Sequence, residues 1–349
     1  MPTDLTLSGL SDWFTQHIAQ SAIWSGIGLA ACVIAAVFLL VWIVRQSYRV
    51  FRSLARLLAK RRRRDAQGYG LSLAPLAGAR GAKTTAALMA SLESDLSEFC
   101  FGAPYEIVRA PAPKATAKLG LRDVARRWLA SSATDVMVWG HRDSGKLAPF
   151  KLDILSREGS LSPEEAVYSR VLLPENYARG SDAIRTCGVY LIARALLPGL
   201  AQATAFRAEK LVPVAAHLAS FLQEADALPD ETALLIERDY CAMALHIGTP
   251  EHLQAVVALR TRRLGATGHL VTAEQISARI DLGRALLAMS ETNFDPKRIR
   301  TAMDHLKIAV DLLRADPSIK LATDTSAAVQ KAQAMLSARR RFSVTGGGI

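Results

Sequence analysis

The segment Gly140–Lys146 comes nearest to a known chemistry, the binding of phosphate groups. It matches the pattern G-x-x-x-x-G-K and follows an apolar run. A phosphate-binding loop also needs a Ser or Thr next, to hold the metal ion, and then a helix whose N-terminus faces the phosphates. Here Leu147 and Pro149 follow, and residues 150–155 alternate like a half-buried strand. We therefore predict a β-hairpin loop here rather than a nucleotide site.

Histidine and cysteine give no second candidate for catalysis or metal binding. None of the seven histidines stands at metal-ligand spacing from another His, Cys or Glu, and no G-x-S-x-G motif occurs. The four cysteines form no C-x-x-C pair, which is typical of reduced thiols packed as small hydrophobic side chains. The sequence therefore predicts no catalytic residue, no metal and no cofactor, and we do not expect an enzyme. The cysteines are Cys32, Cys100, Cys187 and Cys241.

The positive charge of the chain is concentrated in one segment. The chain has 349 residues with a formal net charge of +11, and apolar residues make up 50% of it, which excludes a disordered or low-complexity protein. Residues 45–64 hold nine cations and no acid, so the rest of the chain is close to balanced. The basic character is therefore not evidence that the whole protein binds nucleic acid. The nine cations are Arg45, Arg49, Arg52, Arg56, Lys60, Arg61, Arg62, Arg63 and Arg64.

A run of 23 residues without charge, 22–44, precedes this basic segment. As a helix it would be about 34 Å long, enough to cross a hydrocarbon core of about 30 Å. Trp24 and Trp42 stand near its ends, where indole rings favour the headgroup layer. A cleaved signal peptide would have a basic front and a shorter apolar core. A buried core helix would need a large domain around it. We therefore predict a retained transmembrane helix.

The charges on either side of this helix predict its orientation. Cations lie only after it, so the positive-inside rule places residues 1–21 outside and the C-terminal bulk in the cytoplasm. We expect a single-pass protein of a bacterial inner membrane. Several cations of residues 45–64 recur every three or four residues and would lie along an anionic bilayer surface. A nucleic-acid contact is the alternative, but few stacking aromatic residues are interleaved.

Residues 65–83 are rich in Gly and Pro and predict a linker, followed by a small α/β domain over 84–160. Within that domain the pattern is helix, strand, helix, strand, strand, with the last two strands forming a hairpin. The letters WLASSATDVMVWGHRD followed by FKLDIL resemble the small α/β domain of the TolB-amino-terminal or FlgO-like type. The resemblance implies a non-catalytic accessory domain and carries no functional residue across.

Residues 161–341 predict helices almost throughout, beginning at the capping pattern of Ser162–Glu165, with a flexible tail at 342–349. The helices ARIDLGRALLAMS and AMDHLKIAVDLLRADP resemble a tetratricopeptide repeat, although the turn between them is longer than in that repeat. In such a pair, small residues such as Gly283 let the helices approach, and larger ones such as Leu306 fill the groove. An unrelated helical bundle is the alternative. The expected fold is thus mainly α: a transmembrane helix, a small α/β unit, and a tetratricopeptide-like solenoid or bundle.

Together these features predict a membrane-anchored, cytoplasm-facing adaptor that binds a protein or peptide through its helical array. Its candidate partner-binding residues are Arg260, Arg262 and Arg263, which could equally be solvated cations near a helix end. The alternative function is a small-ligand or nucleotide sensor, or an enzyme, built on residues 104–158. Small residues at 26 and 30 of the membrane helix are too common a pattern to decide whether the protein forms a homo-oligomer.

Overall fold

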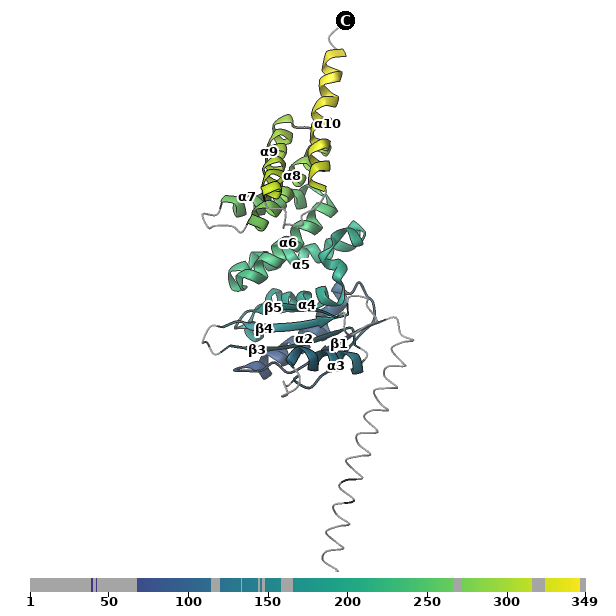
Figure 1. Cartoon of the computed structure of the whole chain (residues 1–349), viewed down its shortest axis with the longest axis vertical. Helices are drawn as coiled ribbons and strands as arrows, with labels where there is room; N and C mark the ends of the chain where they lie inside the picture. Colours follow the sequence, from purple (N-terminus) through teal and green to yellow (C-terminus); the bar gives the residue numbers. More distant parts are fainter. Residues whose placement is uncertain are drawn as a thin grey trace, which may run out of the picture. The chain divides into compact units, whose positions relative to one another are not determined.

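A computed structural model describes most of the chain after residue 67 (Figure 1). The described residues are 68–113, 120–132, 134–143, 145, 148–157, 166–265, 272–315 and 324–345, together with Leu39 and Trp42. The chain divides into two compact units, Met1–Ala66 and Gln67–Ile349. In its described residues the second unit is mainly helical with one five-stranded sheet, which confirms the mainly α class with a small α/β unit.

The sheet has the strand order β2-β1-β3-β4-β5. Strand β1 runs parallel to both β2 and β3, whereas β3, β4 and β5 follow one another antiparallel. Arg142 pairs with Phe150 at the end of the β3–β4 hairpin, so a strand follows residues 140–146 where a phosphate loop would need a helix. The hairpin prediction is therefore confirmed. The strands are β1 (Tyr69–Leu73), β2 (Tyr105–Arg109), β3 (Val136–Arg142), β4 (Phe150–Ser156) and β5 (Val167–Leu173).

Three helices cover the sheet. Helices α2 (Gly81–Phe99) and α4 (Asp182–Leu196) pack together on one face, and α3 (Leu121–Ser132) packs on the other (Figure 1). Strands β2 and β3 lie on opposite sides of β1, so right-handed crossovers must place α2 and α3 on opposite faces.

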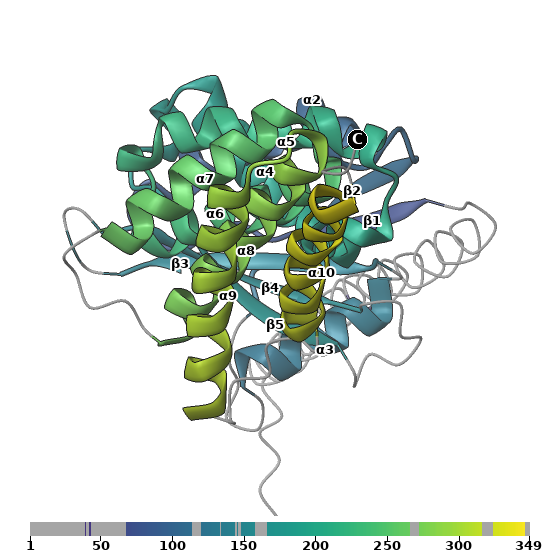
Figure 2. The same cartoon turned by 90° about the horizontal axis from the view of Figure 1, so that it is seen from above.

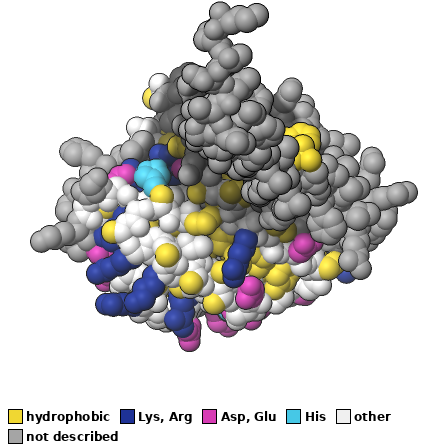
Figure 3. Space-filling view, turned by 90° about the horizontal axis from the view of Figure 1, so that it is seen from below, with side chains coloured by type: hydrophobic (Ala, Val, Ile, Leu, Met, Phe, Trp, Pro, Cys, Tyr) yellow, Lys and Arg dark blue, Asp and Glu magenta, His cyan; other side chains and the backbone are white. Residues whose placement is uncertain are grey.

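Seen from below, the molecule carries Lys and Arg side chains along one margin and hydrophobic side chains nearer the middle (Figure 3).

The predicted linker over 65–83 is wrong for residues 69–73, which form the central strand β1. Glycines at positions 68, 70, 78 and 81 suggested a loop. Leu71 and Leu73 are instead fully buried against α2, and Ser72 faces α3. A strand this short, buried on both faces, has no room for a long alternating pattern.

The predicted helical region over 161–341 is wrong at its start. Residues 167–173 form β5, which pairs with β4 along its whole length. The predicted helix start at 162–165 lies outside the described residues. The letters VYSRVLL are rich in β-branched and aromatic residues, which fit a pleated surface better than a helix. The α/β part therefore extends from residue 69 to the end of α4 rather than over 84–160.

After α4 the chain is helical, and successive helices pack on one another (Figure 2). These helices confirm that this part of the chain is largely helical, with short 3-10 turns before α5. Gly248, with φ 75°, ends α6 in the left-handed conformation that favours glycine. The elements are the 3-10 turns 177–179, 198–201, 203–205 and 225–227, and the helices α5 (Ala208–Gln223), α6 (Asp230–Ile247), α7 (Pro250–Gly265), α8 (Thr272–Thr292), α9 (Pro296–Ala315) and α10 (Asp324–Thr345).

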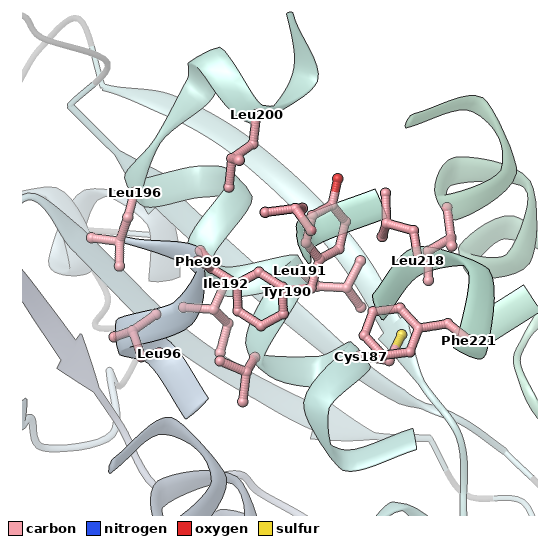
Figure 4. Packing of buried hydrophobic residues seen from close by; sticks show 14 of the residues in the cluster. Leu96, Phe99, Cys187, Tyr190, Leu191, Ile192, Leu196, Leu200, Leu218 and Phe221 are labelled. Atoms are coloured by element: carbon pink, nitrogen blue, oxygen red, sulfur yellow. The ribbon is translucent and has the colours of Figure 1, made fainter. Parts of the chain in front are cut away.

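One hydrophobic core runs from the sheet into the helical array. At its centre Phe99 of α2 meets Tyr190 of α4 edge-on, with ring centroids 5.6 Å apart, and Tyr190 lies 6.4 Å from Phe221 of α5 (Figure 4). The same cluster continues through α6 and α7 to Ala285 of α8. The predicted division between an α/β domain and a helical domain at residue 160 is therefore not a division of the core.

Helices α8 and α9 approach closely at Gly283. A Cβ atom added there would lie 2.6 Å from Cγ of Leu306 on α9 and 3.2 Å from the carbonyl oxygen of Ala302. A larger residue at 283 would force the helices apart. The small residue Gly283 thus lets α8 and α9 approach closely, as expected from the sequence.

Candidate partner-binding surface

Two hollows follow one another along helices α6 and α8. The first, of about 450 Å³, lies between α6, α7 and α8, and the second, of about 410 Å³, between α6, α8 and α10. We call their combined lining the α6–α8 surface. The first hollow is lined by Glu231, Leu234, Leu235, Arg238, Arg260, Arg263, Ala273, Glu274 and Ser277. The second is lined by Leu245, Arg284, Leu287, Ala288, Glu291, Ala327, Ala328 and Lys331.

The residues that line this surface are equally spaced on the two helices. Fourteen residues separate Glu231 from Leu245 on α6, and fourteen separate Glu274 from Ala288 on α8. At 1.5 Å per residue each stretch is about 21 Å long. An extended peptide rises about 3.3 Å per residue, so about six residues would fit along the surface.

The lining combines small, apolar and charged side chains. Alanine or serine at positions 273, 277, 288, 327 and 328 leaves room for the backbone of a bound segment. Leu234, Leu235 and Leu245 offer apolar contact beside these positions. Of the charges in the second hollow, Glu291 is already paired with Lys331, with Oε1 2.5 Å from Nζ.

The three predicted arginines do not act as one group. Arg260 is only 5% exposed, so it is not a solvated cation near a helix end. It follows Leu253 and Val256 on the buried face of α7, a spacing that could have revealed its position. Arg263 lines the first hollow, with Nη2 3.9 Å from Oε2 of Glu274. Arg262 is exposed and lines neither hollow.

Arg260 instead joins three helices through two buried carboxylates. Its Nη1 donates to Oε1 of Glu237 on α6 at 2.7 Å, and its Nη2 donates to Oδ2 of Asp281 on α8 at 2.8 Å. Burial raises the pKa of the Asp281 carboxyl, and the neighbouring guanidinium opposes that rise. Because a buried charge is costly without a partner, this triad fixes the positions of α6, α7 and α8 relative to one another.

A third carboxylate, that of the buried Asp239, ties α6 to the α/β part. Asp239 of α6 accepts a hydrogen bond from Oη of Tyr190 at 2.9 Å and one from Nε of Arg194 at 2.6 Å, both on α4. Its Oδ1 lies 3.7 Å from Nε of Arg238. The carboxylate is therefore held mainly by α4, and Arg238, which lines the first hollow, contacts it only at the longer distance.

The described cysteines are buried, as predicted. Cys100, Cys187 and Cys241 are free thiols at 2% exposure or less. Burial raises the pKa of Cys100 to about 11 and that of Cys241 to about 12. Thiols that are buried and protonated at neutral pH are poor nucleophiles and poor metal ligands. Cys32 lies outside the described residues.

The geometry of the α/β part gives little support to the alternative function, a nucleotide sensor built on residues 104–158. The carboxyl ends of β1 and β3 are the place where an open α/β sheet would bind a ligand. The two arginines there, Arg80 and Arg142, both pair with Glu175, at 3.4 and 2.9 Å. Their charge is thus partly neutralised by the chain itself.

A polar cluster on the α3 side of the sheet was not found from the sequence. Asp153 of β4 is 4% exposed and accepts hydrogen bonds from Oη of Tyr168 at 2.5 Å and Nε of Arg170 at 2.8 Å, both on β5. Burial is the main cause of the raised pKa of Tyr168. The alternation of FKLDIL places Lys151 and Asp153 on one face, which was the available signal. The cluster is explained as a satisfied set of ion pairs between neighbouring strands.

The described part of the chain contains no group of three or more His, Cys, Asp or Glu side chains that could hold a metal ion. His246 contacts the carbonyl oxygen of Phe206 at 2.9 Å, and His217 lies 2.7 Å from Glu98. These contacts assign the two histidines to packing between elements.

The predicted membrane helix and basic segment lie almost wholly outside the described residues. Leu39 and Trp42 are described, in helical conformation, with exposures of 61% and 63%. Among described residues, no helix has the length and apolar character needed to span a bilayer. The nine cations of residues 45–64 and the small residues at 26 and 30 are likewise outside. The predicted flexible tail at 342–349 is wrong for residues 342–345, which belong to α10, and residues 346–349 are outside.

Comparisons with protein-family models, with curated proteins and with solved structures found no match to this chain.

Proposed function

We propose that the protein is a membrane-anchored adaptor that faces the cytoplasm and binds a segment of a protein partner on the α6–α8 surface. The observation that carries this proposal is that two open hollows follow one another along the same two helices, α6 and α8. An enzyme site would instead bring nucleophiles, acids or metal ligands together in one cavity. Among the described residues, the three thiols and the carboxylates of Glu237 and Asp239 are buried in the core or in ion pairs and line neither hollow.

The membrane anchor in this proposal comes from the sequence of residues 22–44 and the cations that follow. Anchoring would raise the local concentration of any partner at the same membrane, so a weak surface could still hold it. The tetratricopeptide-like character of the helical array is part of the same proposal, supported by the close packing of Gly283 against Leu306.

Affinity capture of the full-length protein from gently solubilised native membranes tests the adaptor function. Ala288→Arg places a bulky cation in the second hollow and is expected to lower recovery of a stoichiometric partner about tenfold, which corresponds to about 1.4 kcal/mol of binding free energy. Thr301→Arg, at an exposed position of α9, is the matched control and should leave recovery unchanged. Equal recovery with wild type and Ala288→Arg, or no partner with wild type, would contradict the proposal.

A further inference from the structure

The charges that line the first hollow are separated along its length. Two carboxylates stand at the start of the helices, Glu231 in the first turn of α6 and Glu274 in the first turn of α8. Arg238 lies seven residues further along α6, and Arg284 lies ten residues further along α8, at the second hollow. At 1.5 Å per residue these separations are about 10 and 15 Å. The surface is therefore negative at one end and positive toward its middle.

These four side chains have hydrogen-bonding capacity left over. Within the described part of the chain, none of their charged groups makes a hydrogen bond, and the carboxylate nearest Arg238 is Asp239, at 3.7 Å and already held by α4. Glu274 has a loose contact with Arg263 at 3.9 Å. Arg284 lies beside Asp281, whose carboxylate is bound by Arg260. Guanidinium and carboxylate groups with unused donors and acceptors gain most from partners of opposite charge.

The apolar part of the first hollow lies between the two charged ends. Leu234 and Leu235 lie between Glu231 and Arg238 in sequence, and Ser277 follows Glu274 on the facing helix. A bound segment would thus meet acids, then leucines, then arginines in that order. Arg263 at the acidic end weakens, but does not reverse, the negative charge there.

We infer that the α6–α8 surface selects a protein segment with a basic residue and an acidic residue about three positions apart, separated by an apolar residue. The basic side chain pairs with Glu231 and Glu274, and the acidic one pairs with Arg238 and Arg284. The separation follows from the distance of about 10 Å between Glu231 and Arg238 along α6 and a rise of about 3.3 Å per extended residue. This inference rests on the proposed adaptor function and adds the chemistry of the partner segment to it.

Selection from a random peptide library tests the inference without a known partner. A phage library of random seven-residue peptides would be panned against the full-length protein in detergent micelles. Wild type is expected to enrich peptides with Lys or Arg about three positions from Asp or Glu and an apolar residue between them. No enrichment, or enrichment without a charge pattern, would overturn the inference.

Charge reversal makes the test specific to the named residues. The double variant Glu231→Lys, Glu274→Lys should replace the basic preference by an acidic one. The double variant Arg238→Glu, Arg284→Glu should replace the acidic preference by a basic one, because specificity follows the charges that line the surface. Lys307→Glu, on the exposed side of α9, is the control and should leave the motif unchanged. A motif unaffected by either reversal would overturn the inference, while capture sensitive to Ala288→Arg would still support the adaptor function. Loss of both results would contradict the adaptor function itself.

Discussion

Replacing Arg260 by methionine is expected to destabilise the protein by about 3–5 kcal/mol, the range for removing one partner of a buried ion pair. Methionine fills similar space but leaves Glu237 and Asp281 without their cation, with side chains 9% and 17% exposed. Urea unfolding of the full-length protein in detergent, followed by circular dichroism, measures the free energy of unfolding.

The pH dependence of this loss has a defined sign. Burial already raises the pKa of Asp281, and losing the guanidinium raises it further. A carboxyl group whose pKa is higher in the folded than in the unfolded state lowers the free energy of unfolding as the pH rises. The loss begins near the pKa of the unfolded state, about 4, and is complete above the pKa of the folded state. The difference between wild type and Arg260→Met should therefore shrink near pH 4 and be largest near neutrality. Arg262→Met, at an exposed neighbouring position, should change stability by less than about 0.5 kcal/mol. Equal losses for the two variants would show that Arg260 is not the buried link described here.

Truncating Phe99 to alanine is expected to cost about 3–5 kcal/mol and to weaken sheet and helices together. The ring is fully buried and lies 5.6 Å from the ring of Tyr190 and 5.4 Å from that of His217, so it joins α2 to α4 and α5. Tryptophan fluorescence, with Trp128 and Trp139 beside the sheet, and far-ultraviolet circular dichroism of the helices should show one coincident transition that moves as a whole.

Val212→Ala, at a residue 44% exposed on α5, is the matched control and should move the transition little. A variant Phe99→Ala in which only the fluorescence transition shifts would mean that the sheet and the array unfold separately. The sheet and the helical array would then not share one continuous core.

The helices were predictable because their signals are local. Helical periodicity predicted helices over most of residues 161–341, and the structure has helices α4 to α10 within that range and a few residues beyond its end. Two strands were missed for opposite reasons. Strand β1 is short and flanked by glycines, and β5 follows a capping pattern that favoured a helix. Both are decided by pairing with strands far along the chain, which no local pattern contains.

The candidate surface was less predictable than the fold. Arg260 belongs to a group of neighbouring arginines in the sequence, which favoured an exposed position. It is nevertheless buried, because it lies on the apolar face of α7. Arg238 and Glu274 were not singled out, because each is an ordinary exposed helix residue until α6 and α8 lie side by side. The equal spacing of Glu231 to Leu245 and of Glu274 to Ala288 is visible in the sequence only once the two helices are known to face the same hollows.

The measurement that bears most directly on the adaptor function is site-specific photo-crosslinking in intact cells. A photoreactive residue would replace Ser277, which lines the first hollow on α8, or Lys307, which is exposed on α9. After irradiation, the membrane and soluble fractions would be separated and probed for adducts. The account predicts a discrete protein adduct in the membrane fraction for position 277 and none for position 307. The same adducts at both positions, no adduct at 277, or an adduct confined to the soluble fraction would contradict it.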